Sequence, residues 1–252
     1  MKVIGSSAKT SFFYKNGFND FPNWTLMYKY KCSSTEIELN KYLRKNELKE
    51  FQPVAIFSRK QANGVGQNGR KWISPQGGIW LSAAYPIFSK DFSTDIFSVS
   101  IAFFLCEMFY RKSIEVKIKW PNDIFYGSKK LIGFLPKLIT RGNEVLYAKI
   151  GIGMNLNNFT PVEGISLSKI LSKKNLSESY WSSKILKVLN KAILYNKNKK
   201  QIIYGANKFL NKECLPSGYD NNWSIDEIDQ MGCLRIFNNC LLYTSDAADE
   251  LS

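Results

Sequence analysis

The sequence predicts an α+β fold, because strand patterns and helix patterns both recur along its 252 residues. Residues 115–120 alternate charged and apolar side chains, which is typical of a half-buried strand. Residues 95–111 are apolar almost all round and predict a helix in the core. Trp181, Ile185 and Leu189 recur at every fourth position and predict a helix with one apolar face.

Shorter patterns predict the other elements. A helix is expected to begin in the Ser-Ser-Thr run, because Ser33 with Glu36, or Thr35 with Glu38, has the spacing of a capping box. The turn at 127–128 returns the chain as a β-hairpin. A further helix is expected to end near Phe209, and further strands are expected at 24–30, 53–57, 79–85, 144–155, 223–228 and 233–237.

The charge balance is strongly basic, with 35 Lys and Arg against 21 Asp and Glu and a formal net charge of +14. Such a balance permits a nucleic acid, a membrane surface or an acidic protein as partner. The basic residues are scattered, however, and the only dense run lies at 197–200. This distribution favours a solvated, lysine-rich surface.

Two residue types limit the chemistry of the chain. It has no histidine, which excludes histidine-dependent triads, histidine metal sites and histidine acid–base catalysis. Its five cysteines are odd in number and form no C-x-x-C pair, so neither a disulfide framework nor a zinc site is indicated. No segment has the apolar length of a signal peptide or a membrane span. We therefore expect a soluble, cytoplasmic protein.

A glycine-rich segment at 58–85 carries the most chemistry in the chain. Gly64, Gly66 and Gly69 let the backbone approach a ligand and offer free N–H groups, while Arg70 adds a cation. Trp72 adds a flat apolar face suited to a base. These are the parts of an anion and purine site on a mobile loop between two strands. A plain surface loop is an equally good reading, and the helix that a dinucleotide-binding unit needs does not follow.

A second group of polar residues lies around the predicted hairpin. Asn122 and Asp123 end the strand at 115–120, and Lys130 lies on the returning strand, so Asp123 and Lys130 are expected near opposite sides of the hairpin. Taken singly, Asn122 and Asp123 are more commonly turn residues, and Lys130 is more commonly a surface lysine.

The composition changes near the C-terminus. Short β-like pieces follow residue 216, and from Cys240 the chain is acidic and free of lysine. That last string resembles a translated sequencing-library adaptor, so we expect residues 240–252 to be a non-native tail.

Three separated motifs resemble one family. They are Q-x-x-G-x-G-x-x-G-R-K-W-x-S-P-x-G-G at 61–78, K-W-P-N-D at 119–123 followed by K-K-L-I-G, and G-I-G-M-N at 151–155. In this order they are similar to the biotin–protein ligase (biotin–[acetyl-CoA-carboxylase] ligase) family. The resemblance implies a mixed β-sheet backed by helices over residues 1–212 and a truncated, small SH3-like β domain at 213–239, with no DNA-binding segment before Trp24.

The resemblance also implies roles for particular residues. The implied biotin-binding set is Ser34, Thr35, Gln61, Gly64, Val65, Gly66, Gln67, Lys130 and Gly133. The implied ATP-binding set is Arg70, Trp72, Asn122, Asp123 and Asn155. Within these sets Lys130, Arg70 and Asp123 would be catalytic, and Asp123 with Asn155 would hold Mg²⁺.

The implied reaction activates biotin with ATP and Mg²⁺ as biotinyl-5′-AMP and then transfers biotin to a lysine of the biotin carboxyl carrier domain of acetyl-CoA carboxylase. Neither step needs histidine, and both need cations around accumulating negative charge. No DNA or membrane partner is expected, and a homodimer is compatible with the resemblance. The chain departs from the family at Val65 and Gln67, where basic residues are frequent, at Ser33, where Asp is frequent, and at Lys137, where Glu is frequent.

Other readings stay open at this point. A lipoate–protein ligase would share the fold and the adenylation chemistry, although the G-R-K-W and K-W-P-N-D motifs argue against it. A non-catalytic biotin sensor or a basic nucleic-acid-binding module would use the same surface without the reaction. A truncated fragment could also retain all three motifs.

Overall fold

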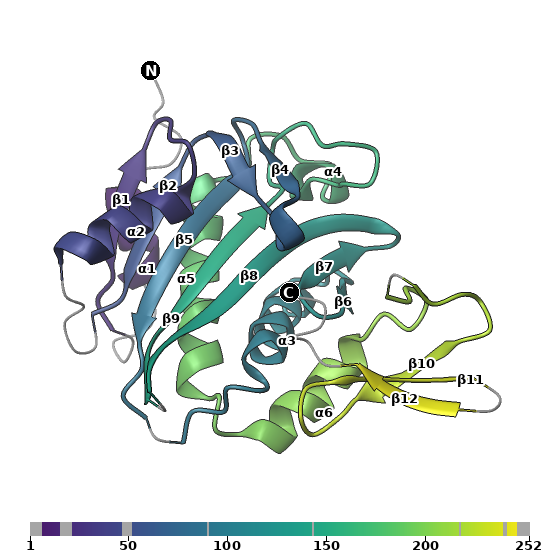
Figure 1. The fold of residues 1–252 in the computed structure, drawn as a ribbon. Coiled ribbons are helices and arrows are strands. Elements are labelled where there is room, and N and C mark those ends of the chain that lie inside the picture. The colour runs from purple at the N-terminus through teal and green to yellow at the C-terminus, as the bar shows by residue number, and fades with distance from the viewer. Residues whose placement is uncertain are drawn as a thin grey trace. The chain divides into compact units, whose positions relative to one another are not determined.

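The computed structural model describes residues 7–15, 22–46, 52–89, 91–142, 144–216 and 218–238, together with the backbone of 241–245 (Figure 1). The chain divides into two compact units. The first combines Met1–Lys90 with Lys129–Asn190, and the second combines Asp91–Ser128 with Lys191–Ser252. Strands and helices occur in both units, which confirms the predicted α+β class.

The first unit is built on a sheet whose strands run in the order β1-β2-β5-β9-β8. Strands β1 and β2 pair in parallel, and the other neighbours in this order pair antiparallel, so the sheet is mixed as expected. The bounds of these strands are β1 Thr25–Lys29, β2 Val54–Ser58, β5 Ile79–Pro86, β9 Glu144–Met154 and β8 Lys129–Arg141.

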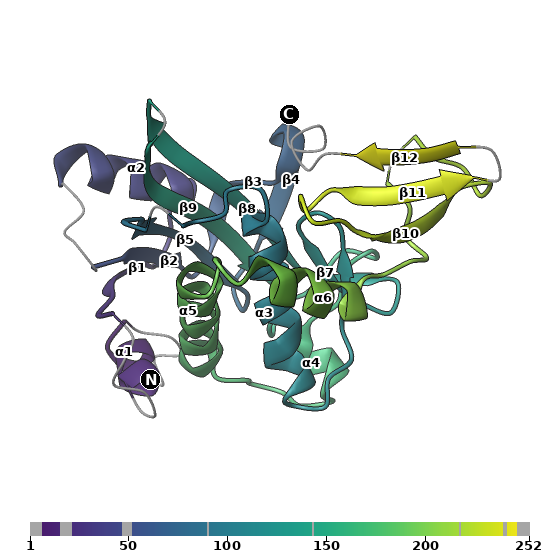
Figure 2. The same cartoon turned by 90° about the horizontal axis from the view of Figure 1, so that it is seen from below.

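Helices cover both faces of this sheet. Figures 1 and 2 show α2 (Thr35–Lys45) on one face and α5 (Glu178–Leu194) on the other. Every residue of β5 is consequently buried, and the strand expected at 79–85 is confirmed. Leu39 of α2 is fully buried against Val54, Ile56 and Ala84 of the sheet, so the helix packs an apolar side onto the strands. Two short helices complete the unit, α1 (Ser7–Lys15) and α4 (Leu167–Ile170).

The second unit contains the predicted core helix, α3 (Phe97–Tyr110), most of whose side chains are buried. It packs against α6 and against the short strands β6 and β7. A small antiparallel sheet in the order β10-β11-β12 forms the C-terminal part, as expected for a small β region. The bounds are α6 Lys199–Phe209, β6 Lys117–Lys119, β7 Asp123–Tyr126, β10 Ser224–Ile228, β11 Leu234–Asn238 and β12 Leu241–Ser245.

Several sequence expectations change in detail. The glycine-rich segment is not an open loop throughout, because β3 (Gln61–Val65) and β4 (Lys71–Ser74) pair as a hairpin around the short helix η1 (Gln67–Gly69). Helix α1 had no sequence signal. Within the expected tail, β12 pairs with β11, while the non-native origin of 240–252 stays a prediction and its remaining residues lie outside the described part of the chain. Among the described residues, no helix combines the length and apolar character that a membrane crossing requires.

Candidate active site

Two glycines form a bare patch on the face of the sheet that carries α2. Gly133 of β8 lies directly opposite Gly153 of β9 in the strand register. A Cβ added at Gly153 would lie 2.6 Å from Nε1 of Trp72, and one added at Gly133 would lie 2.9 Å from another atom of the same indole. Strand glycines of this kind mark a close approach to the backbone. Here the approaching group is the indole ring of Trp72.

Lys130 lies over the same ring. Its ammonium nitrogen is 4.8 Å from the centroid of the Trp72 ring, which is a cation–π distance. The side chain is half-buried, and the backbone N–H of Lys130 donates to the carbonyl of Glu163, so the lysine is not a freely solvated surface residue. Trp72 is itself part-buried, and its indole N–H has no acceptor among the described residues.

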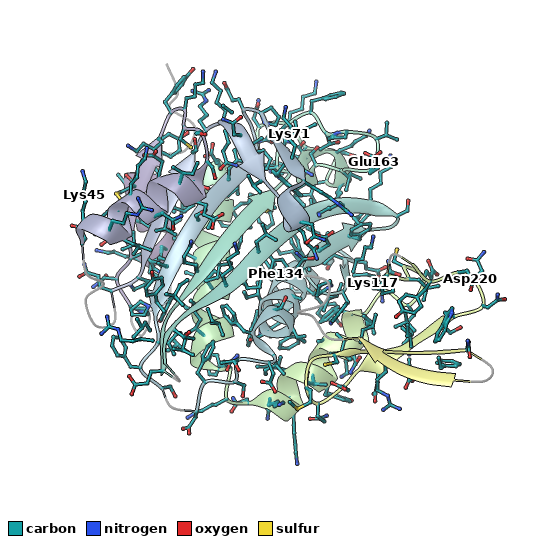
Figure 3. All side chains as sticks on the ribbon, in the orientation of Figure 1. Lys45, Lys71, Lys117, Phe134, Glu163 and Asp220 are labelled. Carbon is teal, nitrogen blue, oxygen red and sulfur yellow. The ribbon has the colours of Figure 1, made fainter. Side chains whose placement is uncertain are left out.

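The hairpin β3–β4 carries Trp72 to this place. Figures 1 and 2 show the hairpin on the same face of the sheet as α2, and Figure 3 labels Lys71, the first residue of β4. The tip turns through Asn68 and Gly69, whose φ values of 52° and 72° lie in the left-handed region that favours glycine. The sequence therefore supplies a turn residue where the backbone needs one.

The predicted anion-binding loop is only partly available to a ligand. The N–H of Gly66 donates to the carbonyl of Arg70, and the N–H of Arg70 donates to the carbonyl of Gln67, so the expectation of free backbone N–H groups is wrong at Gly66. The side chains of Val65 and Arg70 are exposed, and that of Gln67 is half-buried. The loop can therefore offer the Arg70 guanidinium and the Gln67 amide without breaking the core.

The N-terminus of α2 supplies further residues of the candidate site. Ser34 is the N-cap, and its Oγ accepts from the N–H of Glu36 at 3.2 Å, so neither of the two predicted capping boxes is right. Both Ser34 and Thr35 are buried. Oε1 of Gln61 accepts from the backbone N–H of Thr35 at 2.7 Å and from its hydroxyl at 3.0 Å. Two residues of the expected biotin set thus contact each other.

Two serines that sequence reasoning missed extend this contact. Oγ of Ser82 lies 2.9 Å from the hydroxyl of Thr35, and Oγ of Ser74 lies 2.9 Å from Nε2 of Gln61. Both serines are buried. A hydroxyl inside the apolar strand at 79–86 was the available signal, because a buried hydroxyl needs a hydrogen-bond partner.

Asn155 follows β9 and joins the sheet to the next loop. Its amide nitrogen donates to the carbonyl of Lys130 at 3.3 Å, and its Oδ1 accepts from Asn158 at 2.9 Å. The carboxamide is therefore held close to the Lys130 backbone. Its oxygen retains one lone pair for a ligand.

Asn122 and Asp123 belong to the second unit, so their place beside Lys130 stays a prediction. Asn122 is buried, and Asp123 begins β7 opposite Lys119 of β6. In the part of the chain that the structure describes, no three His, Cys, Asp or Glu residues gather in a way that could hold a metal ion. That finding is compatible with a Mg²⁺ ion bound mainly by the phosphates of a nucleotide, because such an ion takes only one or two ligands from the protein.

A further buried carboxyl lies in the first unit, at the start of α5. Burial raises the pKa of Glu178 to about 7, and the nearby Arg59 opposes this rise. Glu178 begins α5, which lies on the face of the sheet opposite to α2. We therefore assign it to the packing of α5.

The chain belongs to the biotin/lipoate A/B protein ligase family, whose model matches residues 29–155. Among curated relatives, the biotin–protein ligase of Homo sapiens is 27% identical over 156 residues, which are 56% of this chain and 21% of that protein. The bifunctional ligase/repressor BirA of Escherichia coli is 31% identical over 121 residues, which are 46% of this chain and 37% of that protein. The chain thus matches well under half the length of these two relatives. The resemblance inferred from the three motifs is confirmed at the level of the family.

Solved structures agree with this fold. The biotin protein ligase of Aquifex aeolicus, in complex with biotin and ATP, aligns with a TM-score of 0.70 at 22% identity and covers 90% of this chain and 96% of that chain. A putative lipoate protein ligase of T. acidophilum with bound lipoic acid aligns with a TM-score of 0.51 at 9% identity, over 69% of this chain and 86% of that chain. At such identities the alignments speak for the fold alone.

Proposed function

We propose that this chain is an ATP-dependent biotin–protein ligase, which activates biotin as biotinyl-5′-AMP and passes the biotinyl group to a lysine of a biotin carboxyl carrier domain. The observation that carries the proposal is the glycine pair Gly133 and Gly153, bordered by the Lys130 ammonium. The polar contact between Thr35 and Gln61 lies on the same face of the sheet, because the Thr35 hydroxyl contacts Ser82, which pairs with Gly151 on that face. The flat ring that rests on this bare backbone is the Trp72 indole, and a ligand carboxylate can meet the Lys130 ammonium beside it.

The polar contact favours biotin over lipoate. The ureido ring of biotin has N–H donors and a carbonyl acceptor, whereas the dithiolane ring of lipoate has neither. Buried Thr35 and half-buried Gln61 would leave polar groups unpaired against a dithiolane, which is costly. The relatives named above as biotin ligases support the same choice.

In the first step, an oxygen of the biotin carboxylate attacks the α-phosphorus of ATP. A new P–O bond forms, the bond to the β-phosphate oxygen breaks, and pyrophosphate leaves. Negative charge gathers at the α-phosphate, and we assign Lys130 and Arg70 to stabilise it. Trp72 would offer its face to adenine, and Asn122 is likewise assigned to ATP binding by the family resemblance. Asp123 and Asn155 would give oxygen ligands to Mg²⁺, which neutralises phosphate charge when it is bound.

In the second step, the ε-amine of the acceptor lysine attacks the acyl carbon. The amide bond forms, AMP leaves with the bonding electrons, and the amine loses its proton to solvent. This step needs the adenylate to stay bound until the carrier domain arrives. We assign that retention to the backbone and side chains of Gly64, Val65, Gly66 and Gln67, and we place the reaction in the cytoplasm. Cys32, Cys106 and Cys214 are free thiols, which suits a reducing compartment.

The test is biotinylation of an apo carrier domain. The chain, ATP, Mg²⁺, biotin and the apo domain are incubated and analysed by avidin blot and by mass spectrometry of the acceptor lysine. We expect a mass increase of one biotinyl group that depends on ATP. Parallel reactions replace biotin by lipoate or omit ATP. A product with lipoate and none with biotin would assign the chain to lipoate transfer, and binding of biotin without any product would make it a sensor.

A further inference from the structure

We infer that Ser74 is a positioning residue of the proposed biotin site, because it fixes the side-chain amide of Gln61 to the backbone of Trp72. The inference rests on the proposed function, since Gln61 is assigned to biotin and Trp72 to the nucleotide. Ser74 itself would touch neither substrate. Its hydroxyl accepts from Nε2 of Gln61 at 2.9 Å and lies 3.2 Å from the carbonyl oxygen of Trp72.

One backbone group sets the direction of every hydrogen bond in this chain of contacts. The N–H of Thr35 can only donate, so the Gln61 atom that it faces at 2.7 Å must be the oxygen Oε1. The Thr35 hydroxyl therefore also donates to Oε1, and it accepts from Ser82. Nε2 of the Gln61 side chain donates to the hydroxyl oxygen of Ser74, and the Ser74 hydroxyl in turn donates to the Trp72 carbonyl. The network runs from β5 through α2 and β3 to β4.

The backbone makes room for this arrangement at one point. The pairing of β3 with β4 shifts register between Gln61 and Gly64, which is the sign of a β-bulge. Bulges often re-aim a side chain next to an active site. A Cβ at Gly64 would lie 2.7 Å from the Ser74 hydroxyl and 2.6 Å from the Trp72 carbonyl oxygen. Only glycine at this position lets Ser74 join the two groups.

The network also decides what remains for a ligand. Both lone pairs of Gln61 Oε1 are used, and one of the two hydrogens on Nε2 is used. Gln61 therefore presents one N–H donor, and the Thr35 hydroxyl presents one lone pair. A donor beside an acceptor is complementary to the C=O and N–H of a cyclic urea or amide. Ser74 holds the donor in this state.

Removing the Ser74 hydroxyl takes this acceptor from Nε2 of Gln61 and removes the additional donor to the carbonyl of Trp72, which stays in the β3–β4 ladder. Ser74 is only 4% exposed, so water replaces the hydroxyl poorly. The Gln61 side chain then has hydrogen bonds on one side alone. We expect Ser74→Ala to weaken biotin binding about tenfold, which is the loss of roughly one buried hydrogen bond.

The experiment is a double-mutant cycle on the biotin dissociation constant, measured by calorimetry with the full chain. The variants are Ser74→Ala, Gln61→Ala and the pair together. Because Ser74 acts through Gln61, Ser74→Ala is expected to change the constant about tenfold in the wild type and hardly at all in the Gln61→Ala background. Ser74→Cys keeps the volume and loses most of the hydrogen bonding, so it should follow Ser74→Ala and provides the measurement if the alanine variant does not fold.

Ser100→Ala is the matched control, because Ser100 is also buried and also donates to a backbone carbonyl, that of Ala192 at 2.9 Å. It should leave the biotin constant unchanged. The inference is overturned if the effects of Ser74→Ala and Gln61→Ala on the biotin dissociation constant are fully additive, or if Ser74→Ala leaves that constant unchanged. In either case, biotin binding by the wild-type chain means that the proposed function is not overturned. If the wild-type chain binds no biotin, the proposed function fails and the inference fails with it.

Discussion

One face of the first unit's sheet has two halves that are filled in different ways. Cross-strand pairing places Val54, Ile56 and Ala84 on the same face as Gly153 and Gly133. Above Val54, Ile56 and Ala84, which we call the apolar half, helix α2 fills the space. Gly153 and Gly133, which we call the glycine half, have no side chains. The space above them holds the indole of Trp72, with the Lys130 ammonium over the ring.

The difference separates residues that stabilise the fold from residues that do chemistry. A glycine inside a strand weakens the strand, since it packs nothing and costs more backbone entropy. Two glycines facing each other are therefore poor for stability unless something must approach the backbone. Changes in the apolar half should lower stability and spare activity, whereas loss of a charged or polar side chain beside the glycine half should lower activity and spare stability.

Lys130→Ala gives the largest expected effect. Loss of a preorganised cation at the α-phosphate costs about 3 kcal/mol or more, roughly a hundredfold in rate. The midpoint of thermal unfolding should hardly change, because an exposed or half-buried cation–π contact contributes only about 1 kcal/mol. The measurement is biotin-dependent pyrophosphate exchange, with circular dichroism melting in parallel. Exchange near the wild-type rate would show that Lys130 has another role.

Val54→Ala tests the apolar half. The side chain is 2% exposed, and its truncation should lower the free energy of unfolding by about 2 kcal/mol through lost burial and a residual cavity. The rate of pyrophosphate exchange per folded molecule should stay within about twofold of the wild-type rate. This is a small effect, because a tenfold change in rate corresponds to about 1.4 kcal/mol. Chemical denaturation followed by circular dichroism gives the first quantity. A large loss of exchange with little loss of stability would contradict the division of the face into two halves.

Two neighbouring glycines of β9 locate the edge of the glycine half. Gly153→Ala would bring its Cβ to 2.6 Å from the Trp72 indole, and the resulting overpacking should destabilise the protein by about 1–2 kcal/mol. Gly151→Ala is the matched control, because the nearest atom to its Cβ is Leu135 Cβ at 3.9 Å, an ordinary contact. Thermal melts of the two variants compare them directly. Equal melting temperatures would mean that Trp72 does not rest on Gly153 in solution.

Much of this arrangement was predictable, because it follows from local pattern. Alternation and apolar runs predicted β8 and β9, and the family resemblance carried by the three motifs implied the chemistry of the site and the roles of Lys130, Thr35 and Gln61. The contact between Thr35 and Gln61 agrees with the set that the resemblance implied. Local pattern succeeds here because each strand buries its own apolar side chains.

The remainder depends on contacts between distant residues. Three consecutive hydroxyl residues could each cap α2, and Ser34 does so while the N–H of Thr35 bonds to Gln61, 26 positions away. Helix α1 is weakly patterned, and its buried Tyr14 bonds to Pro22 and Asn190. The positioning role of Ser74 needs the register shift at Gly64, which no spacing in the sequence reveals. Such features arise only when the strands are paired.

The smallest expected effect concerns the hairpin above the glycine half. No residue of η1, Gln67–Gly69, is buried, and Val65 is 53% exposed, so little within the chain itself holds the tip of the hairpin down. Gln67 offers the adenylate a neutral donor, whereas an arginine would offer charge-assisted hydrogen bonds that are about twice as strong. Gln67→Arg should therefore slow the release of labelled biotinyl-adenylate from preloaded protein by roughly threefold, a gain below about 1 kcal/mol. Gln201→Arg adds the same charge to an exposed position on α6 and should leave release unchanged. If both variants release at the wild-type rate, retention depends on the hairpin backbone and Arg70; if both slow it equally, net charge alone is responsible.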